Sequence, residues 1–553
     1  MDGSGAGKSA SYSKPNAYQK LGSYVFTDPK GELYDDTAGY LQRNGYKIKV
    51  LNLVNPKNSD GYNPLAHIKS DLDVDVIAST IIKGQNKAGA ADPFWDDTAE
   101  MLLKALIFYL IATRPPEEQN LASCAEMVRA AAADSNGSNL LKEMMSVLPL
   151  DHPARTYYKN VEVASEKTFS SILVSVQAKL GKFDSKDIAE VTSTDTISFD
   201  EIGTTKTSVY VISSDTHTAY DFLLTIFFAQ MIQQLYDLAD RSPGGKLKVP
   251  TYFILDEFAN IGQIPDFDKK ISTSRSRKLS FSVILQNLDQ LEAIYDKSYE
   301  TIMGNCDTHL FLGSNSTKTV EYFSKALGEK TISRNSTSKS KDKDGHKSGT
   351  SDSEQIMARA LMTPDELRRM SMDYCIIYEK GIKPVKAKKV FFYKTNMIKE
   401  FEKFKLNHND FDAGVRGVWR KFNPYNPDAG LEDNEATKDL KIESLDDLFD
   451  DEPVKNENTN NKKNNSNTPK SNNNIDLDSL DDLFDNDEQE KAKAKSVKKV
   501  SNNMTDSDLD ELLFDDDDNT SEDSENNDIL DIQKELEAKF DELFGPMDDD
   551  SNN

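Results

Sequence analysis

A glycine-rich run that ends in Lys and Ser, GSGAGKS at residues 3–9, limits this chain to folds in which a loop leads into a helix. The run fits the end of the P-loop pattern GxxxxGK[ST], whose backbone amides wrap phosphate groups while the following helix points its N-terminus at the anion. Asp2 stands where the pattern has its first glycine. A chance glycine-rich terminus is therefore the alternative, unless a second motif supports phosphate chemistry.

The spacing within this loop gives two residues distinct roles. Lys8 would reach the β and γ phosphates of a nucleotide as a compact point charge, and Ser9 would ligate Mg²⁺. The sequence therefore predicts ATP and Mg²⁺ as cofactors. The residues predicted to bind the nucleotide are Gly3, Ser4, Gly5, Ala6, Gly7, Lys8 and Ser9.

The second motif is TYFILDE at residues 251–257, an apolar run followed by two acids. A buried strand here would deliver Asp256 to the Mg²⁺ shell, and Glu257 would polarise the attacking water as general base. Such a strand is weak evidence alone, because acidic residues also cap helices. Together with the P-loop it predicts a nucleotide-hydrolysing site.

A basic segment precedes the apolar run at residues 279–286, which ends in Gln286. A solvated helix face is the ordinary meaning of such charges. The alternative is an arginine finger for a neighbouring subunit together with nucleic-acid contacts, and a Gln near the γ-phosphate would sense it or orient water. The basic residues are Lys269, Lys270, Arg275, Arg277 and Lys278.

Short β-rich runs alternate with helical patterns through the body of the chain, which predicts an α/β fold with a parallel sheet. Strand signals disappear between residues 115 and 187, where short helical patterns indicate a helical insertion. Residues 335–354 are rich in Ser, Lys, Asp and Gly and have no apolar face, so we expect a mobile surface loop there. The predicted strands lie at residues 23–27, 46–54, 209–213, 251–255, 279–286, 309–313 and 374–379.

The acidic charge is concentrated in the C-terminal tail. Residues 431–553 carry 39 Asp and Glu against 13 Lys and Arg, which accounts for almost the whole formal net charge of -27. The composition predicts disorder. SLDDLFD occurs at residues 444–450 and 479–485, with looser copies at 509–515 and 540–545. The repeats predict that the tail binds protein partners, as helix-in-groove peptides do, whereas a solubilising tail is the alternative.

Other classes of site and segment are not indicated. Cys124, Cys306 and Cys375 lie far apart without CxxC spacing, so we expect no disulfide scaffold or zinc site. The most apolar stretches, residues 101–112 and 222–231, are too short to span a bilayer, and the N-terminus is not a signal peptide. We expect no transmembrane segment in this chain.

Longer blocks of sequence surround these motifs. They are GSGAGKS at 3–9, TDPKGEL at 27–33, YNPL at 62–65, DPFW at 92–95, LDEFANIGQIPDF at 255–267, SRSR at 274–277 and LQNLDQLEAIY at 285–295. This combination resembles the type IV coupling proteins of conjugation and type IV secretion, the TraG/TraD class of hexameric DNA-pumping ATPases. The likeness covers about residues 3–395. It is more specific than a P-loop, because SRSR and LQ follow LDEFANIG at fixed distances.

The resemblance implies a RecA-like motor and assigns the site residues by motif. They are Lys8 and Ser9 for Walker A, Asp256 and Glu257 for Walker B, Arg275 for the finger and Gln286 for the γ-phosphate sensor. It also implies a homo-hexamer that recruits a DNA-bound relaxase through an all-helical domain. Such a hexamer would pass single-stranded DNA to type IV secretion channel proteins at the cytoplasmic face of the bacterial membrane.

Family members normally carry N-terminal transmembrane helices and a strand before the P-loop. Neither precedes Met1, so we expect a truncated chain. The alternatives are a chromosome-partitioning-type DNA translocase and a nonhydrolysing adaptor remnant that binds transfer proteins. The predicted domains are a RecA-like motor at 1–114 and 188–400, the helical insertion at 115–187, a linker at 401–430 and the disordered acidic tail at 431–553.

Overall fold

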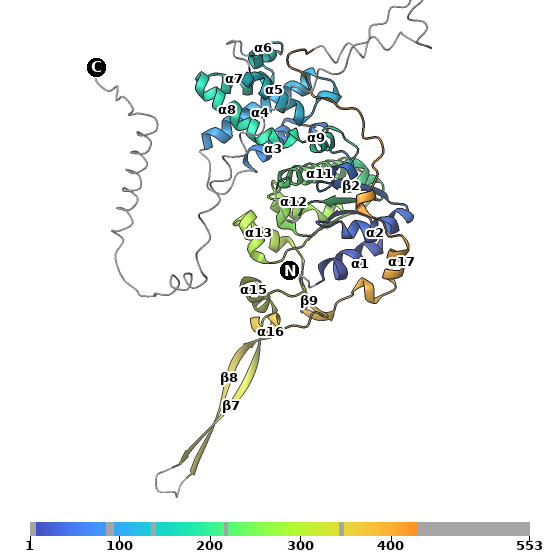
Figure 1. The fold of residues 1–553 in the computed structure, drawn as a ribbon. Helices are drawn as coiled ribbons and strands as arrows, with labels where there is room; N and C mark the ends of the chain where they lie inside the picture. The colour runs from blue at the N-terminus through green and yellow to red at the C-terminus, as the bar shows by residue number, and fades with distance from the viewer. Residues whose placement is uncertain (1–6, 85–92, 134–139, 215–218, 342–347, 428–553) are drawn as a thin grey trace, which may run out of the picture. The chain divides into compact units, whose positions relative to one another are not determined.

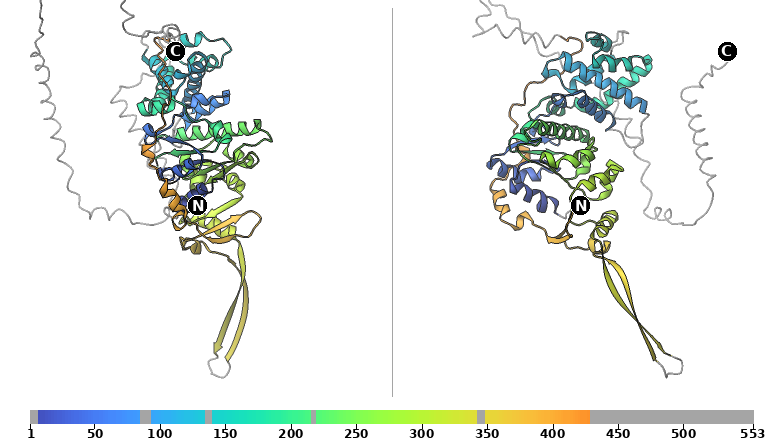
Figure 2. Two further views of the ribbon diagram at one scale, coloured as in Figure 1. Left: turned by 90° about the vertical axis from the view of Figure 1, so that its right-hand side faces the viewer. Right: turned by 180° about the vertical axis from the view of Figure 1, so that it is seen from behind.

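The computed structural model describes residues 7–84, 93–133, 140–214, 219–341 and 348–427 (Figure 1). Within these residues an α/β body has a layer of helices on one side and a long β hairpin on the other, as Figures 1 and 2 both show. This architecture confirms the predicted α/β fold class with a parallel sheet.

A five-stranded parallel sheet forms the centre of the body, in the order β2-β3-β1-β4-β5. Its register pairs Thr27, which ends one strand, with Leu255, which ends its neighbour. Because the strands run the same way, their carboxyl ends meet along one edge and the residues that follow them become neighbours. The strands are β1 (Ser23–Thr27), β2 (Lys47–Asn52), β3 (Thr207–Ile212), β4 (Thr251–Leu255) and β5 (Leu279–Val283).

Alternate residues of the strands enter two different apolar clusters, as the two-residue period of a strand requires. Phe26 packs with residues of the helices on one face, and Val25 packs with those on the other. The first face is covered by α1 (Lys14–Gln19), α2 (Glu32–Arg43) and α17 (Met397–Lys403). The second is covered by α10 (Phe199–Thr204), α11 (Asp221–Arg241) and α12 (Phe267–Thr273).

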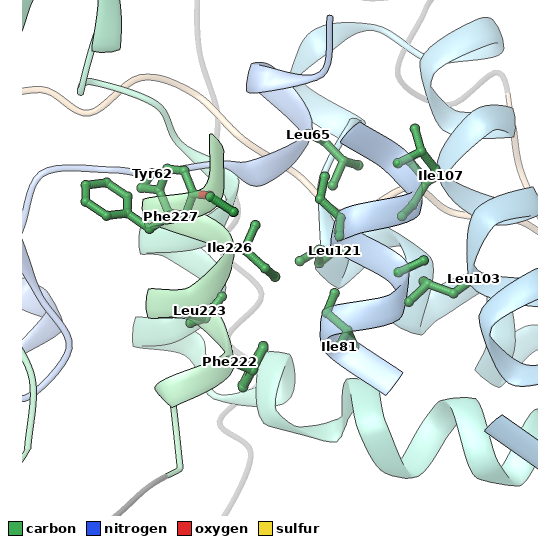
Figure 3. Packing of buried hydrophobic residues seen from close by; sticks show 14 of the residues in the cluster. Tyr62, Leu65, Ile81, Leu103, Ile107, Leu121, Phe222, Leu223, Ile226 and Phe227 are labelled. Atoms are coloured by element: carbon green, nitrogen blue, oxygen red, sulfur yellow. The ribbon is translucent and has the colours of Figure 1, made fainter. Parts of the chain in front are cut away.

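The second cluster continues without a break into the layer of helices. Figure 3 shows Ile226 of α11 facing Ile81 of α3, with Leu103 of α4 beyond them. The helical layer therefore shares its core with the α/β body. Its helices are α3 (Asp71–Lys83), α4 (Pro93–Thr113), α5 (Leu121–Ala133), α6 (Leu140–Ser146), α7 (Pro153–Glu162), α8 (Glu166–Leu180) and α9 (Lys186–Ser193).

Helix α11 is the only helix in the described part that is long and apolar enough to cross a membrane. Within its most apolar stretch, 83% is buried inside the structure. It packs between the sheet and α3, so its apolar character is explained by a core position.

A second, smaller sheet follows the first, in the order β10-β9-β6. Its strands are β6 (Thr308–Phe311), β9 (Tyr374–Glu379) and β10 (Val385–Lys388), and the nearby helices are α13 (Leu288–Tyr295), α14 (Ser298–Asn305), α15 (Thr317–Leu327) and α16 (Pro364–Arg368).

The sequence predicts a mobile loop at residues 335–354. The structure instead has two antiparallel strands there, β7 (Glu329–Lys341) and β8 (Ser348–Ala360), which project from the body (Figures 1 and 2). The mobile loop was predicted because the segment has no apolar face. An apolar face indicates burial, whereas these two strands pair through their backbones.

The segment after α17, predicted to be a linker, contacts the body as far as the structure describes it. The Leu406 amide donates to the Asp35 carbonyl on α2 at 2.9 Å. Arg420 Nε donates to the buried Glu118 carboxylate at 2.7 Å, and Phe422 is 1% exposed within the helical layer. Residues 404–422 therefore connect α2 of the α/β body to the helical layer.

Candidate active site

The predicted acidic pair lies at the carboxyl edge of the central sheet. Asp256 follows β4 and is 7% exposed. Its carbonyl accepts a hydrogen bond from Thr27 Oγ1 at the end of β1, at 2.6 Å. Glu257 adopts the left-handed conformation, with φ 49°, which turns the chain out of the strand. Thr27 thus holds the backbone that presents both acids.

The described part of the P-loop lies beside this edge. Gly7 has φ 88°, a conformation that favours glycine. Lys8 follows, and the first helical turn, η1 (Ser9–Ser13), begins one residue later. The other predicted loop residues, Gly3, Ser4, Gly5 and Ala6, lie outside the described residues.

Five side chains from three segments meet in one polar cluster. The Lys8 ammonium forms an ion pair with Glu257 and lies 3.4 Å from Asp256 Oδ1. Ser9 Oγ donates to Asp256 Oδ2 at 3.3 Å. Gln286 Nε2 lies 3.0 Å from both carboxylate oxygens of Glu257. The structure thus brings together residues that are about 250 positions apart in the sequence.

The charges of the cluster are strongly coupled. Burial lowers the pKa of Lys8, but the Asp256 charge and the hydrogen bond to Glu257 outweigh it, so the net pKa is raised and the ammonium stays charged. Burial raises the pKa of Asp256, and Lys8 opposes that shift. A fixed positive charge therefore lies beside the acids, where phosphate oxygens would bind.

Arg275 lies apart from this cluster. It belongs to the turn η7 (Arg275–Arg277), which immediately precedes β5, whereas Gln286 follows the end of that strand. The strand is about 16 Å long at 3.3 Å per residue, so the two residues lie at opposite edges of the sheet. The Arg275 side chain is 94% exposed, and its nearest acid, Asp307, is 3.9 Å away. Arg275 therefore cannot reach Lys8 within the same chain.

The neighbouring Arg277 has a structural partner. Its Nε and Nη2 atoms donate to the two oxygens of Asp240 on α11, at 2.8 and 3.0 Å. This bidentate pair occupies the guanidinium. Of the two arginines in SRSR, Arg275 is the one that points into solvent.

Sequence reasoning missed Thr27 and Asp28, which follow one another at the end of β1. Asp28 is 3% exposed, and its Oδ2 accepts the Tyr34 amide at 2.8 Å in the first turn of α2. Burial raises the pKa of Asp28 to about 6, and the Tyr34 hydrogen bond limits the shift. The TDPKGEL block could have indicated these two residues, because its polar residues directly follow an apolar strand.

The raised pKa of Asp28 predicts a pH-dependent stability. The folded state holds the proton more tightly than the unfolded state, whose pKa is 3.8. Stability is therefore fully present below pH 3.8 and is lost as pH rises through 6. We expect Asp28→Asn to raise the free energy of unfolding by about 3 kcal/mol at pH 8 and by about half of that at pH 5.

Urea unfolding of both proteins at the two pH values measures this difference. The exposed Asp151→Asn is the matched control and should change stability equally little at both. Equal effects of Asp28→Asn at pH 5 and pH 8 would contradict the assigned pKa.

Comparisons with known proteins give the family of this chain. The family model for type IV secretory system conjugative DNA transfer matches residues 1–414. The conjugal transfer protein TraG of Agrobacterium fabrum is 23% identical over 418 residues, which are 72% of this chain and 60% of that protein. Protein VirD4 of Rhizobium radiobacter is 24% identical over 405 residues, 71% of this chain and 56% of that protein. The chain thus spans less than two thirds of the length of these relatives.

Among solved structures, the plasmid coupling protein TrwB in complex with ADP and Mg²⁺ is similar with a TM-score of 0.48 and 18% sequence identity. The match covers 70% of this chain and 84% of that one. With three quarters of its sequence matched by the family model, the chain belongs to the type IV secretory system conjugative DNA transfer family.

Proposed function

We propose that this protein is an ATPase that drives DNA transfer through a type IV secretion channel. One observation carries the proposal. At the carboxyl edge of the sheet, Glu257 contacts both Lys8 and Gln286. This edge is where ligands bind in open α/β sheets. A P-loop lysine beside a strand-end acid pair is the arrangement that phosphoryl transfer requires.

Ser9 and Asp256 fit a Mg²⁺ ion that accompanies the nucleotide. Their oxygens lie 3.3 Å apart, close to the separation of about 3 Å between adjacent ligands in an octahedral Mg²⁺ shell. No described group of three or more His, Cys, Asp and Glu forms a metal site of its own, so phosphate and water oxygens would complete the shell. Bound Mg²⁺ would neutralise charge on the phosphates.

Glu257 is the general base in this proposal. It takes a proton from water as the water oxygen bonds to the γ-phosphorus and the bond to the β-phosphate oxygen breaks. Gln286, in contact with both Glu257 oxygens, orients that carboxylate and senses the γ-phosphate. Lys8 binds the β and γ phosphates.

The exposed Arg275 completes the site from a neighbouring subunit. Because it lies at the edge of the sheet opposite Lys8 in its own chain, a finger role requires a second copy. A closed ring supplies that copy at every site, and we propose a homo-hexamer.

The family assignment supports the partners. We propose that the protein acts at the cytoplasmic face of the bacterial membrane, where it recruits a relaxase with its DNA and contacts channel proteins. The resemblance implies that this DNA is single-stranded. The acidic tail repels phosphate, so it binds protein partners instead of DNA.

A conjugation assay in the natural host tests this function. We predict that replacing the gene with a Lys8→Ala version lowers the frequency of DNA transfer to that of a deletion strain, because the nucleotide is no longer held. Lys47→Ala, an exposed lysine outside both the cluster and the basic segment, should transfer DNA normally. Transfer by Lys8→Ala at the wild-type frequency would exclude an ATP-driven role for this site.

A further inference from the structure

An aromatic segment lies directly against the P-loop. Phe391 is 8% exposed, and a Cβ atom at Gly7 would meet its ring at 2.9 Å. The next residues form the turn η8 (Phe392–Lys394), which packs against η1. The segment therefore borders both the phosphate loop and the first helical turn after Lys8.

Polar and cation–π contacts fix this segment at several points. Lys389 Nζ donates to the Leu312 carbonyl at 2.7 Å. The Lys14 ammonium lies 4.6 Å above the Phe392 ring. Lys394 pairs with Asp373 at 3.0 Å and lies 4.7 Å above the Phe391 ring. The Lys389 amide also donates to the Asp373 carbonyl at 2.8 Å, so the segment has both side-chain and backbone anchors.

Tyr393 presents an aromatic ring to solvent from this fixed segment. Its side chain is 48% exposed. The ring stacks on Phe391 at 5.3 Å between centroids and 29° between planes, and it meets Phe392 edge to face at 5.6 Å. A tyrosine held in this way offers a large rigid surface at a low entropic cost of ordering.

We propose that Tyr393, supported by Phe391, is the platform on which the base of the bound nucleotide stacks. The proposal rests on the proposed function, because it needs a nucleotide in the P-loop. Lys8 and Glu257 mark the γ-phosphate end of the site, whereas the loop amides hold the α and β phosphates. The ribose and base continue from the α-phosphate past the start of the helix, and η8 borders that turn.

Stacking on Tyr393 predicts tolerance of the base. Every base has a π face, so stacking discriminates weakly between bases, whereas hydrogen bonds to the base edge discriminate strongly. ATP and GTP should therefore bind with dissociation constants within a few-fold of each other.

Titration calorimetry of the full chain with Mg²⁺ tests the platform. The ligands are ATP, GTP and inorganic tripolyphosphate, which has no base. The proteins are wild type, Tyr393→Ala, Tyr393→Phe and the control Tyr425→Ala, an exposed tyrosine on the helical layer. We expect Tyr393→Ala to weaken ATP and GTP by about tenfold and to leave tripolyphosphate unchanged. Tyr393→Phe and Tyr425→Ala should match wild type.

The ligand without a base separates the two ways in which the proposal can fail. The platform is wrong, while the nucleotide site stands, if Tyr393→Ala binds ATP as tightly as wild type. The same conclusion follows if its affinity for tripolyphosphate falls as much as its affinity for ATP. If wild type binds neither ATP nor tripolyphosphate, the proposed function fails and the platform falls with it.

Discussion

Glu257→Gln should hydrolyse ATP at least about a hundredfold more slowly than wild type while still binding it, because a positioned general base contributes about 10²–10⁴ in rate. The substitution keeps the shape of the side chain and an oxygen that accepts from Gln286. It removes the negative charge that pairs with Lys8 and, with it, the ability to take up the proton of the attacking water. Phosphate release under saturating ATP measures the rate, and titration with a fluorescent ATP analogue measures binding.

The binding measurement separates loss of chemistry from loss of the site. Glu257→Gln removes a negative charge near the phosphates, so its affinity for MgATP should equal or exceed that of wild type. Glu300→Gln, an exposed glutamate on α14, is the control and should hydrolyse ATP normally. Turnover of Glu257→Gln within threefold of wild type would remove Glu257 from the base role.

Arg275→Ala has the second large expected effect. An arginine finger is worth about 10³–10⁵ in rate, and a side chain that is 94% exposed contributes little to folding. We therefore expect Arg275→Ala to lose about a thousandfold in turnover without a change in the unfolding transition. Steady-state hydrolysis and thermal unfolding of the same preparation measure both quantities. Lys47→Ala, an exposed lysine at the start of β2, provides the control.

Mixed subunits show whether Arg275 acts in the neighbouring site. Lys8→Ala and Arg275→Ala should each be inactive alone. In an equal mixture about a quarter of the interfaces combine an intact Lys8 with an intact Arg275 in a closed ring, so about a quarter of wild-type activity should return. A mixture as inactive as its two components would contradict a finger supplied by a second subunit.

Local patterns in the sequence were enough to predict the sheet and the acid pair. The runs at residues 23–27, 251–255 and 374–379 coincide with β1, β4 and β9. These strands are apolar and bounded by polar residues, so each carries its own signal. Asp256 and Lys8 were paired on their motifs alone, and the structure places them 3.4 Å apart.

Contacts between distant segments were not predictable in this way. The bond from Thr27 to the Asp256 carbonyl depends on the strand order, which places β1 beside β4. Arg275 lies at the edge of the sheet opposite the cluster because β5 runs from Arg275 toward Gln286. The SRSR motif does not indicate the direction of that strand. Phe422 is buried although the nearby apolar residues Val418 and Tyr425 are exposed, so no periodicity indicates that it is buried.

The most direct test of ATP-driven DNA transfer is steady-state ATP hydrolysis by the full chain while single-stranded DNA is titrated, with Lys8→Ala measured alongside. We predict that wild-type turnover rises with DNA and that Lys8→Ala stays at background at every DNA concentration. ATP binding without turnover, with or without DNA, would contradict the motor and favour a nonhydrolysing adaptor that binds transfer proteins.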